Sequence, residues 1–368
     1  MTTARQRGRS QSGFEPIDLP RVLHYPDATR YAARMEGHLT RAPASLSDDG
    51  AGQHDVHADT PVDPYDPMWL REHSQDWDIV HVHVGLPPGT DPRLPIALDT
   101  HRRQGTPVLV TVHDLPGSGT IAGDALDMPS VQRVLADAWL VTTFTTGAAR
   151  TILERTGIRP RVIPHGPMLS GADLLRARRY RTACGGEWGP ILVELEPHHP
   201  ANDVNGALDA CALLAGSMPV RLLVHAVHEH AVAGHPGIQA ADLVVHHGLA
   251  FDQVVDHIAA ARALVLPRTA GLHSQRLELA ADIGTPVISG RVGHLAEQHP
   301  VVGVPVHDGR IDVAALVEAM LTPPEHSVTS RVEDRERAWA EVCMAHERLY
   351  STARSHGAHV PDHSASTP

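Results

Sequence analysis

The sequence predicts an α/β protein with two doubly wound domains, and two observations carry this prediction. Short apolar runs alternate with amphipathic segments along most of the chain, which is typical of parallel strands joined by helices. With 368 residues, the chain is long enough for two domains of about 100–200 residues each. Because hydrophobic residues make up 42% of it and aromatic residues only 4%, we expect cores of Ala, Val and Leu.

The first domain is expected over residues 18–170, after a polar tail at 1–17 that we expect to be disordered. Residues 43–65 are rich in Asp, Gly, Pro and Ser and predict a long loop. The predicted strands are 21–25, 79–84, 107–112, 139–142 and 161–164, and the predicted helices are 93–104 and 147–156.

A second domain, residues 189–325, repeats this pattern after a linker at 171–188. The predicted strands are 191–193, 221–224, 243–245, 264–266 and 287–288, and the helices are 203–215 and 252–261. A C-terminal segment, 326–354, contains a long amphipathic helix at 332–354, and a disordered tail is expected at 355–368.

The linker carries four arginines: Arg176, Arg178, Arg179 and Arg181. Such a run predicts a solvated face, and peripheral contact with an acidic membrane surface is the alternative.

The composition excludes several functions. A formal net charge of −12 weighs against general nucleic-acid binding. The chain has 31 arginines and no lysine, so no lysine can form a Schiff base or clamp a phosphate. Three cysteines fit neither a disulfide framework nor a zinc motif, which favours the cytoplasm. No apolar run reaches the ~20 residues of a membrane span, so no transmembrane segment is expected.

The 28 histidines show no spacing typical of a metal site, because no HExxH or CxxC frame accompanies them. We therefore expect no bound metal, and we interpret the histidines at 225–235 and 246–247 as surface or loop residues. His81 and His83 share one face of a predicted strand, where core packing at the top of the sheet is the expected role.

The clearest functional pattern lies between Leu264 and Ser289. An apolar run ends at Pro267, and a loop, a helix-like segment, a Gly-Thr-Pro turn and a second apolar run follow. A loop between a parallel strand and a helix N-terminus gathers free N–H groups and the positive end of the helix dipole. We expect an anion, most often a phosphate, at the backbone of Gly271, Leu272, His273 and Ser274.

Four segments carry a family resemblance: DIVHVHVG from Asp78, GTPVLVTVHDL from Gly105, RVIPHGP from Arg161 and GTPV from Gly284. In order and spacing they resemble retaining glycosyltransferases of family 4, which have the GT-B fold, and most closely a compact actinobacterial branch. The resemblance covers roughly residues 78–350. It implies two Rossmann-like domains with a nucleotide-sugar in the cleft, held mainly by the second domain, and an unknown acceptor on the first. It also implies that the last helix crosses back onto the first domain and that no metal is needed.

The resemblance implies roles for individual residues. His113 matches the family's active-site histidine near the reacting sugar; the alternative is a strand-end histidine bonded to backbone. His165 and Gly166 face the hinge, where binding and structural roles are equally open. Glu278 matches the second of two glutamates, which binds the ribose hydroxyls, although six residues rather than the usual five lead from it to Gly284.

Three departures from the family pattern bear on catalysis. Ala270 stands where the family has its first glutamate, with His273 or Ser274 as candidate replacements. The diphosphate clamp of Arg and Lys is absent, and Glu194 and Glu196 stand there instead. The glycine-rich loop after the first strand is also missing. Arg268 is the best substitute for the clamp, with His198 and His199 as weaker ones.

These departures leave an alternative hypothesis open, in which the chain is a catalytically degenerate GT-B protein that binds a nucleotide or partners an active transferase. A nucleotide-sugar epimerase of the same fold fits the VHDL and PHGP segments less well.

Overall fold

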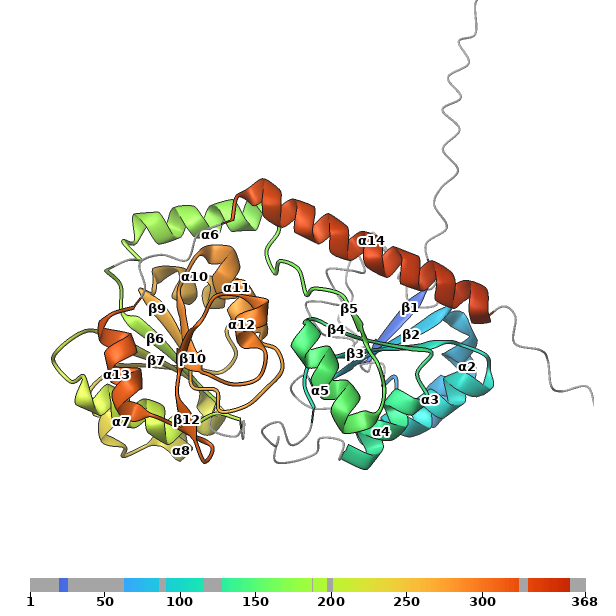
Figure 1. Ribbon diagram of the computed structural model, residues 1–368, viewed down its shortest axis with the longest axis horizontal. Helices are drawn as coiled ribbons and strands as arrows, with labels where there is room; N and C mark the ends of the chain where they lie inside the picture. Colours follow the sequence, from blue (N-terminus) through green and yellow to red (C-terminus); the bar gives the residue numbers. More distant parts are fainter. Residues whose placement is uncertain are drawn as a thin grey trace, which may run out of the picture.

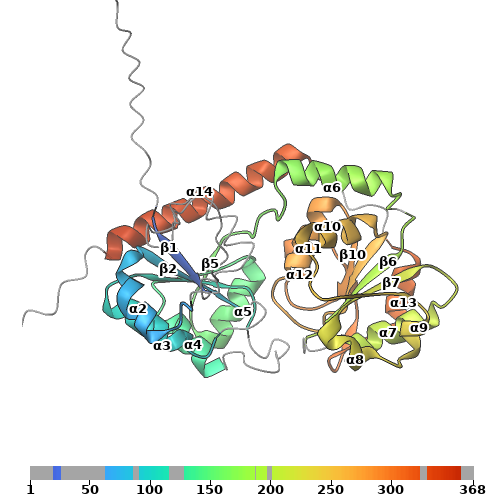
Figure 2. The ribbon, with the colours of Figure 1, turned by 180° about the vertical axis from the view of Figure 1, so that it is seen from behind.

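The computed structural model describes residues 20–25, 63–85, 91–115, 128–186, 188–196, 201–323 and 330–357. The expected tail at 1–17, most of the loop at 43–65 and the segment after the first strand lie outside these residues, as do His198, His199 and the chain beyond residue 357. The described residues form two α/β domains side by side, bridged along one edge by two helices (Figures 1 and 2).

The first domain is built on a parallel sheet with strand order β1-β2-β3-β4-β5. The strands are β1 (Val22–Tyr25), β2 (Ile79–Val84), β3 (Val108–Val112), β4 (Leu140–Thr143) and β5 (Arg161–Val162), and the helices are α2 (Pro67–His73), α3 (Leu94–Arg103), α4 (Met128–Ala136) and α5 (Thr146–Thr156). Every residue of β1, β2 and β3 is buried, as expected for parallel strands covered on both faces.

The second domain has the strand order β11-β10-β9-β6-β7-β8. The strands are β6 (Ile191–Leu195), β7 (Val220–His225), β8 (Asp242–His246), β9 (Ala263–Leu266), β10 (Val287–Gly290) and β11 (Val302–Val304). The helices are α7 (Val204–Leu213), α8 (Glu229–Val232), α9 (Pro236–Gln239), α10 (Phe251–Ala260), α11 (Gln275–Ile283), α12 (Leu295–Gln298) and α13 (Val313–Leu321), and β12 (Val306–His307) pairs with β13 (Arg310–Ile311). Strand order reverses between β6 and β9, which makes their carboxyl ends a topological switch point.

The segment predicted as a linker forms α6 (Gly171–Ala183), which packs on the second domain. The prediction of a solvated face was wrong for Arg181, which is 8% exposed. Its guanidinium donates hydrogen bonds to the carbonyl oxygens of Ala259 and Ala261 and to the Thr285 hydroxyl. Arg176, by contrast, lies at the surface and pairs with Asp256.

The last helix, α14 (Val332–Gly357), returns along the first domain. Trp339, Val342, Leu349 and Tyr350 belong to one apolar cluster with Val22 of β1, Ile79 of β2 and Leu109 of β3. The last described helix therefore packs on the same domain as the first described strand.

The α/β class with two doubly wound domains is confirmed. Most predicted strands and helices are found at nearly the same residues. Helices α2, α4, α6, α8, α9, α12 and α13 and strands β11, β12 and β13 were not predicted. No helix among the described residues is both long enough and apolar enough to cross a membrane.

Candidate active site

Three histidines from both domains meet where the domains touch. His113 follows β3, His165 follows β5, and both are almost fully buried. His273 precedes α11, with its ring centroid 5.8 Å from that of His113 and 4.7 Å from that of His165. The ring of Phe144, just after β4, lies 4.3 Å from the His273 ring. The structure thus assembles the three predicted histidines into one group.

His113 is held from within the first domain. Its Nε2 lies 3.1 Å from Nδ1 of His83 on β2, so a neighbouring side chain, rather than the backbone alone, orients the ring. Burial, helped by nearby histidines, keeps the pKa values of His113 and His273 well below the usual range. Both rings are therefore neutral at pH 7 and can offer hydrogen bonds to a hydroxyl but no positive charge.

Gly166 lies against the returning helix α14, and His165 bonds to the Gly166 carbonyl. Nδ1 of His165 donates to the Gly166 carbonyl oxygen at 2.9 Å, which makes Nε2 the acceptor nitrogen. Gly166 has a φ of +74°, and a Cβ added there would lie 3.0 Å from Val342 of α14. The glycine therefore makes room for α14.

The predicted anion-binding loop is docked onto the first domain. Leu272 is 2% exposed and belongs to the same apolar core as Val112 and Leu115. Its backbone N–H donates to Oδ1 of Asp114 at 3.3 Å. Gly271 has a φ of +125°, a conformation that favours glycine. This loop is a direct contact between the two domains.

The N-terminus of α11 is satisfied by the protein itself. The Ser274 hydroxyl accepts from the Leu277 N–H at 3.3 Å, as an N-cap does. The side chain of Gln298 accepts from the Ser274 N–H at 3.1 Å and donates to the Ser274 carbonyl at 2.8 Å. An anion at this helix end would take the place of Gln298.

Glu278 is a buried, fully engaged carboxylate. It is 3% exposed, and it accepts from Arg335 at 2.6 Å, from His299 at 2.9 Å and from Gln298 at 3.1 Å. Burial alone would raise its pKa, but the bond from His299 and the nearby positive charges hold the pKa at about 2. Arg335 also pairs with Asp282. A ribose bound here would have to replace His299 or Gln298.

Two glutamates at the switch point are each paired with an arginine. Glu194 accepts from Nε of Arg276 at 2.7 Å, and Glu196 lies 3.5 Å from Arg268. The repulsion that these glutamates would exert on a diphosphate is therefore offset. The predicted phosphate ligand Arg268, however, already has a carboxylate beside it, and the two side chains are only 17% and 39% exposed.

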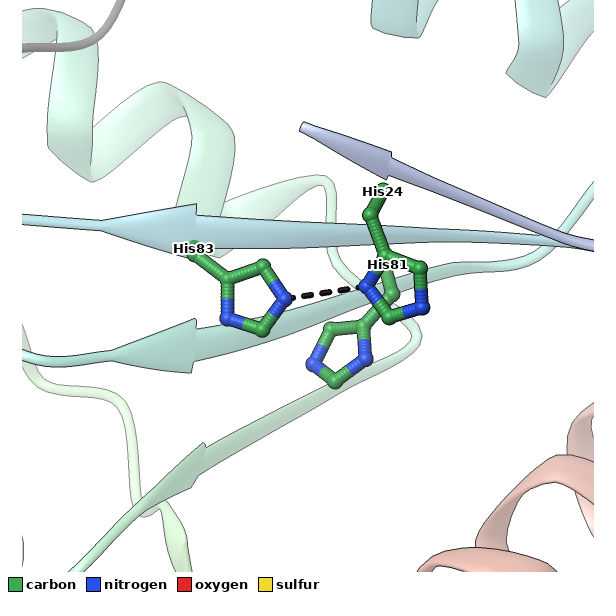
Figure 3. Close-up of side chains that lie close together, drawn as sticks. All are labelled: His24, His81 and His83. Atoms are coloured by element: carbon green, nitrogen blue, oxygen red, sulfur yellow. Dashed lines mark hydrogen bonds between the residues drawn. The ribbon is translucent and has the colours of Figure 1, made fainter. Parts of the chain in front are cut away.

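Two groups of side chains among the described residues have the composition of a metal site. His165, His273 and Glu278 form one, and His24, His81 and His83 form the other, each with one ligand atom per residue within 4.8 Å of the others. In the first group the guanidinium of Arg335 already contacts the carboxylate, and it would repel a cation there. The second group lies inside the first domain (Figure 3).

Several residues of the site were missed from the sequence: Asp114, Arg276, Gln298, His299 and Arg335. Asp114 had a signal, because it follows His113 in the VHDL segment. Arg276 lies two residues before Glu278, on the first turn of the same helix. The other three come from distant segments, and no local pattern marks them.

No family model and no curated protein matches the sequence. Solved structures do match over most of its length. A sucrose-phosphate synthase from Thermosynechococcus elongatus is 15% identical, with 78% of each chain covered and a TM-score of 0.55. A glycosyltransferase from Rickettsia africae is 10% identical, covering 80% of this chain and 84% of that one, with a TM-score of 0.52. The Anabaena HepE protein in complex with UDP-glucose is 15% identical over 80% and 83% of the two chains, with a TM-score of 0.50.

At these identities the likeness shows the fold. The chain consists of two Rossmann-like domains in the GT-B arrangement.

Proposed function

We propose that this protein transfers a sugar from a nucleotide-sugar to an acceptor, with retention, as a family-4-like glycosyltransferase of the cytoplasm. The proposal is carried by the meeting of His113, His273 and the N-terminus of α11 beside the switch point of the second sheet. Ligands of open α/β sheets bind at such points. One similar structure is a complex with UDP-glucose and another is a glycosyltransferase, which supports a nucleotide-sugar donor.

The proposed roles follow the geometry. His113 contacts the reacting sugar. His273 takes the place of the glutamate missing at Ala270, because the hydroxyl of Ser274 caps α11. The backbone of Gly271 to Ser274 binds the diphosphate. Arg268 gives up its contact with Glu196 and binds the diphosphate as well.

The remaining donor ligands surround this centre. Glu278 binds the ribose once His299 or Gln298 has moved, and His165 and Gly166 line the hinge side. The helix N-terminus and arginine neutralise the leaving diphosphate, so the transfer step itself uses no metal. The acceptor binds on the first domain.

A second candidate is a degenerate GT-B protein that binds a nucleotide without turnover. It is favoured by one observation. Glu278, Arg268 and Ser274 already have protein partners at the positions where donor groups would bind.

The test measures turnover of UDP-, GDP- and ADP-sugars through the nucleotide that is released. Binding of each nucleotide is measured in parallel by calorimetry. We expect hydrolysis of one donor, and a loss of about 10²-fold or more for His113→Ala. Glu278→Ala should mainly weaken donor binding. His101→Ala is the matched control, since His101 is fully buried in α3 of the same domain. Tight nucleotide binding without turnover of any donor would favour the degenerate protein, and absence of both would overturn both candidates.

A further inference from the structure

Three imidazole side chains converge inside the first domain, away from the junction with the second. His24 of β1 lies opposite His81 of β2 in the strand register, and His83 lies two residues further on the same face. Their ring centroids are 4.4 to 5.3 Å apart. Figure 3 shows the three rings close together over one face of the strands, with a hydrogen bond between His24 and His83.

The three rings are sealed from solvent. None is more than 1% exposed, and Nε2 of His24 has no hydrogen-bond partner among the described residues. A buried polar nitrogen without a partner is costly, and buried polar atoms in folded proteins are nearly always satisfied by protein, water or an ion. The protein therefore leaves the hydrogen-bonding capacity of the His24 ring only partly used, while its Nδ1 faces the other two rings.

His81 and His83 each have one nitrogen anchored by a neighbour outside the group. Nε2 of His81 lies 2.7 Å from the Thr111 hydroxyl, and Nδ1 of His83 lies 3.1 Å from Nε2 of His113. This anchoring leaves Nδ1 of His81 and Nε2 of His83 as the available nitrogens. Metal-binding histidines are held in this way, with one nitrogen on the ion and the other on a neighbouring group.

The hydrogen bonds of two threonines determine which nitrogen of His81 carries the proton. The Thr142 hydroxyl donates to the Val110 carbonyl oxygen at 3.4 Å, so its oxygen accepts from Thr111 at 2.7 Å. The Thr111 oxygen then accepts from Nε2–H of His81, which leaves the lone pair on Nδ1. That Nδ1 lies 2.8 Å from the hydroxyl of Tyr350 on α14.

We propose that His24, His81 and His83 bind one divalent transition-metal ion of the zinc type, with the Tyr350 hydroxyl as the fourth ligand. The site is structural and takes no part in the proposed transfer reaction. It would tie β1 and β2 to α14. This proposal departs from the expectation of no metal, which rested on sequence spacing, because the proposed ligands come from two strands and a helix far apart in sequence.

The distances suit such an ion. Tetrahedral Zn–N bonds of about 2.0–2.1 Å place neighbouring ligand atoms about 3.3 Å apart. Nδ1 of His24 lies 3.0 Å from Nε2 of His83, and Nδ1 of His81 lies 2.8 Å from the Tyr350 oxygen. These two pairs need open only by a few tenths of an ångström, and the other ligand atoms of the three histidines, which lie within 4.8 Å of one another, need to close by at most about 1.5 Å.

The chemistry selects the ion. Imidazole nitrogens suit Zn²⁺, Co²⁺, Ni²⁺ and Cu²⁺, whereas Mg²⁺ and Ca²⁺ require oxygen ligands. Burial lowers the pKa of His24 to about 3 and holds that of His81 well below its usual range, so protons do not compete at pH 7.

The full-length protein is stripped with a chelator and dialysed against Zn²⁺, Co²⁺ or Mg²⁺, and its metal content, Co²⁺ absorption spectrum and Tm are measured. We expect one tightly held Zn²⁺ per chain, the intense visible absorption of tetrahedral Co²⁺, and a rise in Tm with Zn²⁺ but not with Mg²⁺. These readouts do not depend on sugar transfer.

Two variants and two controls sharpen the test. His24→Gln and His83→Gln should each lose the tight ion, whereas His101→Gln, equally buried in the same domain, should keep it. His225→Gln tests for loose binding at the histidines of the second domain, because His225 and His246 are adjacent there. The proposal is overturned if wild type holds no ion and gains no Tm with Zn²⁺, or if His24→Gln retains the full stoichiometry.

Discussion

The two domains share one architecture but satisfy their buried polar groups in opposite ways. In the first domain the polar interior is a set of neutral histidines, including His24, His81 and His83, whose pKa values are lowered by burial. In the second domain the polar interior is ionised, with Arg335 between Glu278 and Asp282 and Arg276 on Glu194. A neutral network is stable only while it stays unprotonated, whereas an ion-paired network depends on every partner being present. The two domains should therefore unfold under different conditions.

The largest expected effect is that acid unfolds the first domain before the second. His24, with a pKa of about 3, and His101 and His346, each about 4, have usual values of 6.5. Below about pH 7 these three histidines become protonated in the unfolded chain but stay neutral in the folded one. The free energy of unfolding therefore falls as pH drops from about 7 toward 3–4. At pH 5 the cost is roughly 2 kcal/mol for each histidine, or about 6 kcal/mol in all.

Tryptophan fluorescence can follow this transition. Trp69, Trp77, Trp139 and Trp339 lie in or against the clusters of the first domain, while Trp188 is 86% exposed. The pKa of Glu278, about 2 instead of 4.5, is low, so its contribution is lost only as pH falls from about 4.5 toward 2. Hydrogen exchange at β6 and β9 should therefore remain slow near pH 5. Simultaneous loss of both signals would contradict the contrast between the domains.

Arg335→Ala should have the next largest effect, and on the second domain. The change leaves the buried carboxylates of Glu278 and Asp282 without their guanidinium. Breaking a buried ion pair by removing one partner costs about 3–5 kcal/mol, measured as the free energy of unfolding in urea. Arg337→Ala is the control on the same helix, since its side chain is 67% exposed and pairs only at the surface. Equal effects of the two substitutions would show that the buried network contributes no stability.

The sequence predicted the framework better than the site, and His113 and Glu278 show why. Apolar alternation follows each strand locally, so β2, β3 and β9 could be placed from neighbouring residues alone. His113 could be found because strand ends meet at one edge of a sheet, whereas Asp114, the next residue, was missed as part of the site. The partners of Glu278 come from α12, the loop after it and α14, about 20 to 57 residues away. Such contacts are set by domain packing, which local periodicity does not contain.

The group of His24, His81 and His83 shows the same limit of local sequence patterns. No closely spaced ligand motif marks it, because His24 lies 59 residues before His83. Only the pairing of β1 with β2 brings these rings together.

Leu272→Ala should have a smaller effect, and on the contact between the domains. Leu272 belongs to the second domain in sequence, but its side chain is buried in the core of the first. Truncating a buried leucine costs about 2–5 kcal/mol, and we expect roughly 2 kcal/mol because the loop can settle into the gap. Small-angle scattering should show a more open protein. Leu213→Ala, at a 67% exposed leucine, is the control and should leave both stability and shape unchanged.

The smallest expected effect concerns the donor site, where Glu196→Gln should strengthen nucleotide binding. Glu196 lies 3.5 Å from Arg268 at the switch point, and its side chain is 39% exposed, so losing this pair should change stability by less than about 1 kcal/mol. Without the competing carboxylate, Arg268 can turn to a diphosphate, and we expect a several-fold lower Kd by calorimetry. Asp242→Asn removes an exposed pair with Arg221 on β8 and β7 and changes the net charge by the same amount. If both variants bind the nucleotide equally well, the gain reflects overall charge and Arg268 has no special place at the phosphate.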